Sequence, residues 1–194
     1  AAQRYESRYL ITLNSDLVFR DSIWLDRMID FMDQHPMVAL AGPTGVVYQR
    51  TPLDRLGWCR VATPAEASAG QYDSISGSVC IIRQSVIDDV GLFDECFTPG
   101  YYEDTDFAFR AVAAGWQIAI CPVDHGHHDL GPEKSTASIK REELAAKYGN
   151  FQKRNRDIFV KRWLTSTRGA ATPQELQTEF KRLYVPKAKL LHAR

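Results

Sequence analysis

The sequence lacks the features of a membrane-spanning or secreted protein. Its apolar runs fall well short of the roughly 20 residues that a helix needs to cross a bilayer. The first residues, Ala1 to Glu6, do not form the apolar core of a signal peptide. We therefore expect a cytoplasmic protein whose contact with a membrane, if it has one, is peripheral.

Cysteine is scarce and widely spaced. The four cysteines, Cys59, Cys80, Cys96 and Cys121, form no C-x-x-C pair. This spacing indicates neither a structural zinc site nor a redox motif, and we expect buried, reduced thiols.

Common catalytic signatures are missing as well. The chain has no G-x-G-x-x-G sequence, no P-loop, no Gly-x-Ser-x-Gly nucleophile elbow and no H-E-x-x-H motif. Their absence argues against a zinc hydrolase and against a serine hydrolase of the elbow type.

The net charge of zero conceals an asymmetry between two parts of the chain. The 194 residues, 44% of them hydrophobic, suffice for one globular domain with an appendage, which we place at residues 1–138 and 139–194. The first part carries a net charge of −9 and the second +9. An acidic part suits a divalent cation, whereas a basic tail suits an anionic membrane surface or a phosphate-bearing acceptor. Ordinary solvated helices explain the basic tail equally well.

Hydrophobic periodicity predicts alternating strands and helices, which is typical of an α/β protein. The expected strands are 9–13, 38–43, 79–82 and 116–121, and the expected helices are 21–35, 85–91, 103–115, 139–148, 151–164 and one from Thr172. Asp21 or Ser22 is expected to cap the first helix, and Ser85 to Asp88 form a capping-box pattern for the second. Residues 49–76 have weak periodicity and should be irregular or form short strands.

Two acidic clusters stand at the ends of predicted elements. Asn14-Ser15-Asp16 follows the first strand, where ligands collect in open α/β sheets. The carboxylate of Asp16 suits Mg²⁺ or Mn²⁺, although Asn-Ser-Asp is also ordinary turn chemistry. Asp104 falls in the first turn of a helix, whose dipole favours the anionic form that a general base requires. A structural capping acid would occupy the same position.

Three of the five histidines lie within four residues of one another, at His125, His127 and His128. This crowding in a polar loop favours a metal or phosphate contact. Exposed loop histidines without a function are the alternative.

Together these residues resemble the second half of a family 2 glycosyltransferase with the GT-A fold, a three-layer α/β fold around a mixed sheet. Three blocks carry the resemblance: Leu13-Asn14-Ser15-Asp16, the stretch from Gly77 through Phe93-Asp94-Glu95 to Tyr101-Tyr102-Glu103-Asp104-Thr105-Asp106, and Pro122 with the histidine loop. The order and spacing of these three blocks are specific to the family, whereas any one block alone could be accidental. Asn155, Phe159 and Trp163 also resemble a helix that often follows in bacterial members.

The resemblance implies an inverting transfer of a sugar from a nucleotide-sugar donor to a hydroxyl of a glycan or lipid-linked acceptor, without any nucleic-acid partner. The implied product is a bacterial envelope or other surface polysaccharide. The resemblance also implies a role for each site residue: Asp16 and His128 hold Mn²⁺ or Mg²⁺, Asp104 is the general base, Glu103 orients the acceptor, Gly77 and Ser78 let the backbone approach the donor sugar, and Asn14, Tyr102 and Asp106 contact substrate.

Two departures from the family pattern matter. Asn14 stands where an acid is frequent, which lowers the ligand charge of the metal site. The nucleotide-binding half that normally precedes the metal motif is missing, so the chain is a fragment of a longer protein, or another chain supplies that half, or this form is inactive. We favour a fragment. A non-catalytic scaffold that keeps the fold and a metal-dependent phosphohydrolase are the alternative functions.

Overall fold

The computed structural model describes residues 7–50, 56–124, 127–128 and 135–164. The chain has a mixed α/β fold, which confirms the predicted class. The predicted helix from Thr172 lies outside the described residues. None of the helices within them is long and apolar enough to cross a membrane.

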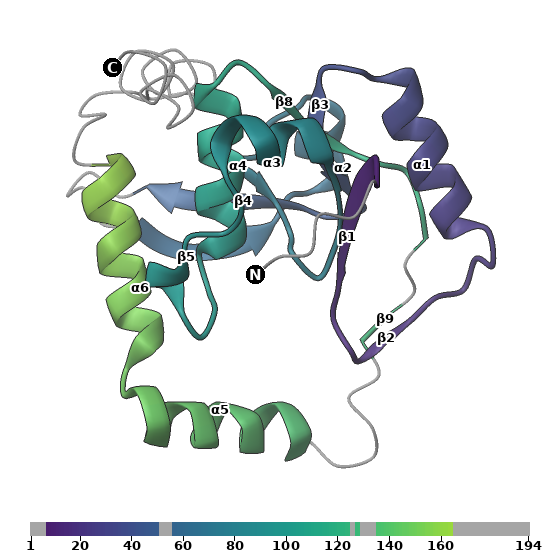
Figure 1. Ribbon diagram of the computed structural model, residues 1–194. Helices are drawn as coiled ribbons and strands as arrows, with labels where there is room; N and C mark the ends of the chain where they lie inside the picture. Colours follow the sequence, from purple (N-terminus) through teal and green to yellow (C-terminus); the bar gives the residue numbers. More distant parts are fainter. Residues whose placement is uncertain (1–6, 51–55, 125–126, 129–134, 165–194) are drawn as a thin grey trace.

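The main sheet has four strands in the order β1-β7-β3-β8 (Figure 1). The strands are β1 (Tyr9–Leu13), β3 (Val38–Gly42), β7 (Val79–Arg83) and β8 (Gln117–Ile120). β7 pairs antiparallel with both β1 and β3, whereas β3 and β8 are parallel. All five residues of β3 are buried. The uninterrupted apolar sequence of β3 thus matches a central strand that is covered on both faces.

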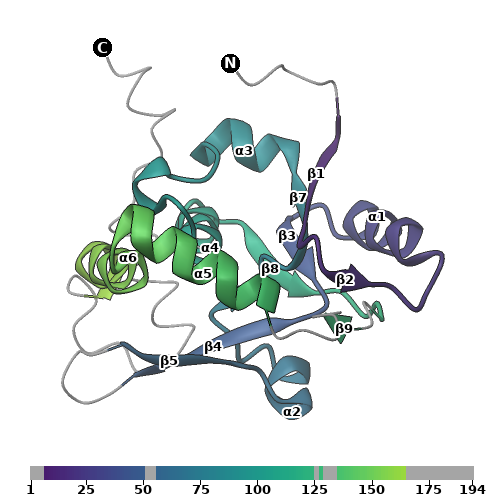
Figure 2. The ribbon, with the colours of Figure 1, turned by 90° about the horizontal axis from the view of Figure 1, so that it is seen from below.

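Helices cover the two faces of this sheet (Figure 2). On one face, α1 (Trp24–Gln34) inserts Met28 and Met32 into a cluster with Val79 and Ile81 of β7. On the other face, α3 (Gln84–Val90) and α4 (Glu103–Ala113) pack against β3 and β7 in a second cluster that includes Phe107. Alternate residues of β7 enter different clusters because strand side chains point to opposite faces.

The region of weak periodicity, residues 49–76, was expected to be irregular or to form short strands, and it contributes short strands to a small antiparallel sheet. Its strands are β4 (Gly45–Arg50), β5 (Leu56–Val61) and β6 (Ser74–Ile75), in the order β5-β4-β6. The short helix α2 (Pro64–Ser68) follows β5, with a capping box between Thr63 and Glu66. A separate pair of strands, β2 (Leu17–Val18) and β9 (His127–His128), joins the first acidic cluster to the histidine segment.

The predicted caps of α1 and α3 are wrong. Neither helix has a side-chain cap; α1 begins at Trp24, and the Asp21 Oδ1 accepts a hydrogen bond from the Ile23 N–H at 3.0 Å instead. α3 begins at Gln84, ahead of the expected Ser85 cap, and the Gln84 N–H donates to the Arg8 carbonyl at 2.9 Å. Strand pairing therefore continues up to the first residue of the helix.

Among the described cysteines the prediction of burial is only partly confirmed. Cys80 and Cys121 are free and buried, whereas Cys96 is free and exposed. Burial raises the pKa of the Cys121 thiol to about 11, so this group stays protonated at neutral pH.

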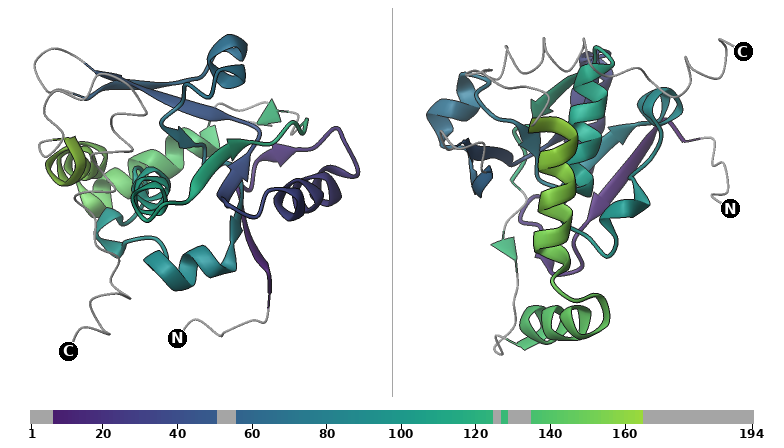
Figure 3. Two further views of the ribbon diagram at one scale, coloured as in Figure 1. Left: turned by 90° about the horizontal axis from the view of Figure 1, so that it is seen from above. Right: turned by 90° about the vertical axis from the view of Figure 1, so that its left-hand side faces the viewer.

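Helices α5 (Ser135–Tyr148) and α6 (Phe151–Phe159) follow the sheet, and α6 continues into the π-helical turn η2 (Val160–Leu164). α5 runs steeply across the direction of α6 (Figure 3). Phe159 and Trp163 are buried in one cluster with Phe109 and Ala113 of α4. The segment from α6 to η2 is therefore packed into the same structure as α4.

Candidate active site

Three segments that are distant in sequence meet at the turn formed by Gly77 and Ser78. The Asn14 N–H donates to the Ser78 carbonyl at 2.9 Å, just beyond the end of β1. The Gly77 N–H donates to the Oδ2 of Asp104 at 2.9 Å, in the first turn of α4. The turn thus links the residue that opens the first acidic cluster to a carboxylate of the second.

Ser78 also stabilises the turn itself. Its Oγ lies 2.9 Å from the Oγ of Ser76, and its N–H donates to the same Ser76 oxygen at 3.3 Å. Thr12 of β1 donates its hydroxyl to the Gly77 carbonyl at 3.3 Å. These bonds fix the backbone against which Asp104 packs.

The carboxylate of Asp104 is held through both oxygens. Oδ2 accepts from Gly77, while Oδ1 accepts from the Thr105 N–H at 2.7 Å and from the Thr105 hydroxyl at 3.3 Å. Burial raises the pKa of Asp104, and the hydrogen bonds from Gly77 and Thr105 oppose that rise. The group is thus oriented by the backbone and is a stronger proton acceptor than a solvated aspartate.

Glu103 lies in a different environment from its neighbour. Its Oε2 is buried, and it is the one buried side-chain nitrogen or oxygen atom without a hydrogen-bond partner in the described part of the chain. Burial raises the pKa of Glu103 to about 7, and the adjacent charge of Asp104 adds to the effect. A carboxyl group that titrates near neutral pH is suited to exchanging protons, which the sequence alone did not indicate.

Asp106 is fully buried. Its Oδ2 accepts from the Arg110 Nε, and its Oδ1 accepts from the Arg162 Nη1 and the Trp163 Nε1, each at 2.8 Å. This geometry gives Asp106 a structural role, joining α4 to η2, in place of the expected contact with substrate.

Tyr102 is half-buried and precedes α4 in a left-handed conformation, with φ 75°. Its ring lies 5.4 Å from the ring of Phe159, measured between centroids. Tyr101 has φ 72° and is 48% exposed. Of the two tyrosines, Tyr101 is the more accessible aromatic surface beside the carboxyl pair.

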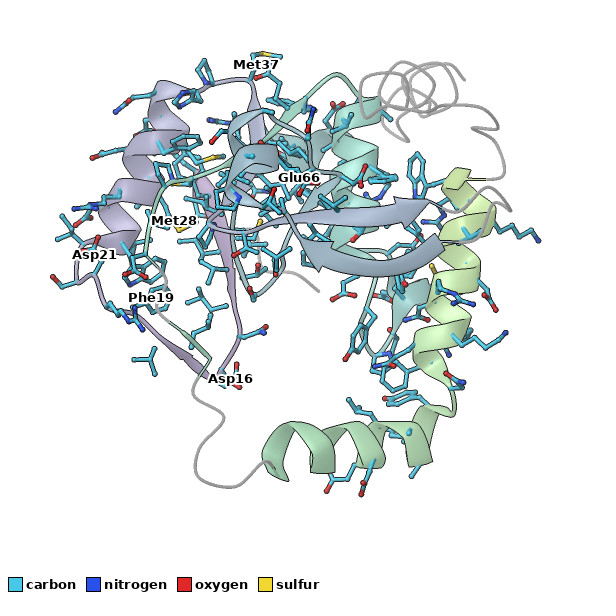
Figure 4. All side chains as sticks on the ribbon, turned by 180° about the vertical axis from the view of Figure 1, so that it is seen from behind. Asp16, Phe19, Asp21, Met28, Met37 and Glu66 are labelled. Atoms are coloured by element: carbon cyan, nitrogen blue, oxygen red, sulfur yellow. The ribbon has the colours of Figure 1, made fainter. Side chains whose placement is uncertain are left out.

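Asp16 lies in the turn between β1 and β2 and is partly exposed (Figure 4). The next residue, Leu17, pairs with His128 across the short ladder of β2 and β9. The backbone register thus brings the histidine segment beside the first acidic cluster. The side chains of His127 and His128, and all of His125, lie outside the described residues.

A metal-binding cluster of three or more His, Cys, Asp or Glu side chains is not found among the described side chains. The donor chemistry of Asp16 with His128 nevertheless fits a cation that accepts carboxylate oxygen together with imidazole nitrogen, as Mn²⁺ does. Asn14 adds an amide oxygen on the same turn.

Comparison of the sequence with models of known protein families finds no match. Comparison with curated proteins finds no match either. The functional argument therefore rests on the motifs and on the geometry of this site.

Proposed function

We propose that the protein takes part in inverting sugar transfer from a nucleotide-sugar donor to an acceptor hydroxyl, as a family 2 glycosyltransferase with the GT-A fold does. The observation that carries this proposal is the hydrogen bond between Gly77 and Asp104. It places a carboxylate with a raised pKa beside the turn that also binds the end of β1. Two of the three motifs of the resemblance, residues 13–16 and the stretch from Gly77 to Asp106, are thus joined by hydrogen bonds.

In this reaction Asp104 accepts the proton of the acceptor hydroxyl. The acceptor oxygen then forms its bond to the anomeric carbon of the sugar, while the bond from that carbon to the diphosphate oxygen breaks and the nucleoside diphosphate leaves. Attack from the face opposite the leaving group inverts the anomeric centre. The hydrogen bonds from Gly77 and Thr105 hold the carboxylate in one orientation for this step.

Glu103 is assigned to orient the acceptor. Its pKa of about 7 leaves a large share of the group protonated at neutral pH, so the carboxyl group can either donate to or accept from a sugar hydroxyl. The reverse assignment, with Glu103 as the base, makes the opposite prediction for single substitutions, and the Discussion separates the two.

Asp16 and His128 are the residues that would hold Mn²⁺ or Mg²⁺. When bound, the cation would neutralise the negative charge that develops on the leaving diphosphate. Asn14 is expected to contact the donor from the same turn.

The acceptor is proposed to be a glycan or a lipid-linked sugar of a bacterial surface polysaccharide. Lys153 and Arg156 of α6 and Lys161 of η2 give the outer surface of this segment exposed basic groups, which suit an anionic membrane surface. A protein at the cytoplasmic face of the membrane would meet such an acceptor. The basic residues from 165 onward lie outside the described residues.

The test is an assay of the full-length protein with UDP-linked and dTDP-linked sugars, Mn²⁺ and an acceptor glycan. Saturable donor binding with formation of an inverted glycosidic product is the expected result. Absence of metal-dependent nucleotide binding would favour a scaffold, and release of phosphate without sugar transfer would favour a phosphohydrolase.

A further inference from the structure

One face of α6 contacts the segment that leads into the carboxyl pair. Four residues at intervals of four, Phe151, Asn155, Phe159 and Trp163, are all buried, with no more than 4% of any of them exposed. In an α-helix this spacing places side chains on one face. The same four residues therefore form a continuous stripe, which η2 extends beyond the end of α6.

Each member of the stripe contacts the segment 97–106. The ring of Phe151 lies 5.9 Å from that of Tyr101, and the ring of Phe159 lies 5.4 Å from that of Tyr102. Trp163 donates its Nε1–H to Asp106 at 2.8 Å. Asn155 lies between these contacts and is the one member of the stripe that bonds to the backbone of this segment.

Both the nitrogen and the oxygen of the Asn155 side-chain amide form hydrogen bonds. Its Nδ2 donates to the carbonyls of Phe97 at 2.5 Å, Gly100 at 2.7 Å and Tyr101 at 3.3 Å. Its Oδ1 accepts from the Arg154 Nη2 at 2.9 Å and from the Arg154 Nε at 3.0 Å. Because Oδ1 is bound to a guanidinium, the amino group must be the end that faces the three carbonyls.

The backbone held by Asn155 is unfavourable on its own. Tyr101 and Tyr102 are consecutive left-handed residues with side chains, a conformation that persists only where surrounding contacts impose it. Glu103 and Asp104 follow at once. The stripe thus holds both the backbone and the rings of Tyr101 and Tyr102. These two residues directly precede the carboxyl pair and so set its position.

We propose that Asn155 is a positioning residue for the pair Glu103 and Asp104. It contacts neither carboxyl group, and it acts by tying three carbonyls of the preceding loop to α6. Its importance for catalysis rests on the proposed function, whereas its control over the environment of Glu103 does not. The proposal also gives the segment from α6 to η2 a direct part in shaping the site.

The experiment compares Asn155→Ala with Asn150→Ala in the full-length protein. Asn150 caps the same helix, where its side chain accepts from the Lys153 N–H at 3.2 Å, and none of its hydrogen bonds reaches the loop. Both substitutions should lower the melting temperature. Only Asn155→Ala should shift the titration midpoint of Glu103, followed by the carboxyl ¹³C resonance and assigned by comparison with Glu103→Gln.

The same two variants are then assayed for sugar transfer. Asn155→Ala should lower kcat on the order of tenfold to 100-fold, with a smaller change in the KM for the donor, because the carboxyl pair is misplaced while the donor site is kept. Asn150→Ala should leave kcat within about twofold of the wild type. If Asn155→Ala does not fold, Asn155→Ser, which keeps one donor, is expected to show the same effects in weaker form.

The outcomes separate this proposal from the proposed function. A Glu103 titration that is the same in Asn155→Ala, Asn150→Ala and the wild type overturns the positioning role. A shifted titration in Asn155→Ala, together with no transfer even by the wild type, supports the positioning role and contradicts sugar transfer. Equal kcat in the two variants would show that the amide serves helix packing alone.

Discussion

The Gly77 N–H donates to the Asp104 Oδ2 at 2.9 Å across 27 positions of sequence. A Cβ atom at position 77 would lie 2.9 Å from that same oxygen and 3.2 Å from the Cβ of Asp104. The close approach explains why the turn carries glycine. The hydrogen bond requires that position 77 has no side chain, because the Asp104 carboxylate occupies the space that a Cβ atom there would need.

Gly77→Ala should therefore destabilise the protein through its contact with Asp104. We expect a loss of about 1–3 kcal/mol, the usual cost of overpacking. Chemical denaturation measures it. The matched test is the double variant Gly77→Ala with Asp104→Ala, in which the nearest oxygen is removed. The loss in the double variant should be smaller than the sum of the two single losses, and simple additivity would contradict the proposed clash.

Asp104→Asn should abolish most sugar transfer while the protein remains folded. The amide cannot accept the acceptor proton, and we expect kcat to fall by a factor on the order of 100 to 10,000. Asp88→Asn, an exposed substitution on α3, is the control and should leave transfer unchanged. Glu103→Gln should raise the KM for the acceptor more than it lowers kcat. A larger loss of kcat in Glu103→Gln than in Asp104→Asn would reverse the two roles.

The raised pKa of Glu103 predicts a dependence of stability on pH. The folded-state pKa of about 7 lies above the ordinary value of 4.5, so the folded protein binds more protons than the unfolded chain between these values. Stability should fall as pH rises from about 4.5 to 7, and then level off. The loss of unfolding free energy that Glu103 causes over this range should be about 2 kcal/mol once solvent screening is allowed for. Burial acts on Asp104 in the same direction.

Glu103→Gln isolates this contribution. The neutral amide has no titration, so the difference in unfolding free energy between variant and wild type should grow in favour of the variant from pH 4.5 to 7. Denaturation curves at several pH values measure the difference. A constant difference across this range would show that Glu103 titrates normally in the folded protein.

Asp106→Asn should destabilise the fold far more than Asp94→Asn. Both carboxylates accept from Arg162, but Asp106 is fully buried and also binds Arg110 and Trp163. Breaking a buried charge network costs about 3–5 kcal/mol, whereas the loss at the half-exposed Asp94 should be about 1 kcal/mol. Urea denaturation compares the two. Similar small losses of stability in the two variants, together with a raised KM for Asp106→Asn, would contradict the structural role and favour the substrate contact expected from the sequence.

The predictions from sequence were accurate where the signal is local. The strand Tyr9–Leu13 and the helix that begins at Glu103 follow from short apolar runs and from acids in a first helical turn, and both are confirmed. The caps of α1 and α3 were misplaced because strand pairing and turn geometry determine where those helices start.

The burial and the pKa of individual carboxyl groups could not be predicted from the sequence, because both depend on residues that are distant along the chain. Asp106 looks like another accessible acid of the cluster, and its burial becomes visible only with Arg162, 56 positions away. Glu103 acquires its pKa of about 7 from burial in the folded protein. The spacing of Phe151, Asn155, Phe159 and Trp163 at intervals of four was the one sequence signal that could have indicated a helix face turned toward the site.

Asp16→Asn should weaken metal-dependent binding of the donor. Asp16 provides the carboxylate of the proposed cation site, and its turn is joined to the histidine segment by the pairing of Leu17 with His128. Replacement by an amide removes the ligand charge, which Asn14 cannot restore. We expect the Mn²⁺-dependent affinity for a nucleotide-sugar to fall on the order of 10- to 100-fold, measured by titration calorimetry of the full-length protein. Asp21→Asn, which alters a carboxylate that instead pairs with Arg27 at 3.1 Å, is the control. Unchanged Mn²⁺-dependent affinity in Asp16→Asn would remove Asp16 from the metal site, and an equal loss in both variants would indicate a general effect of negative charge on this edge of the protein.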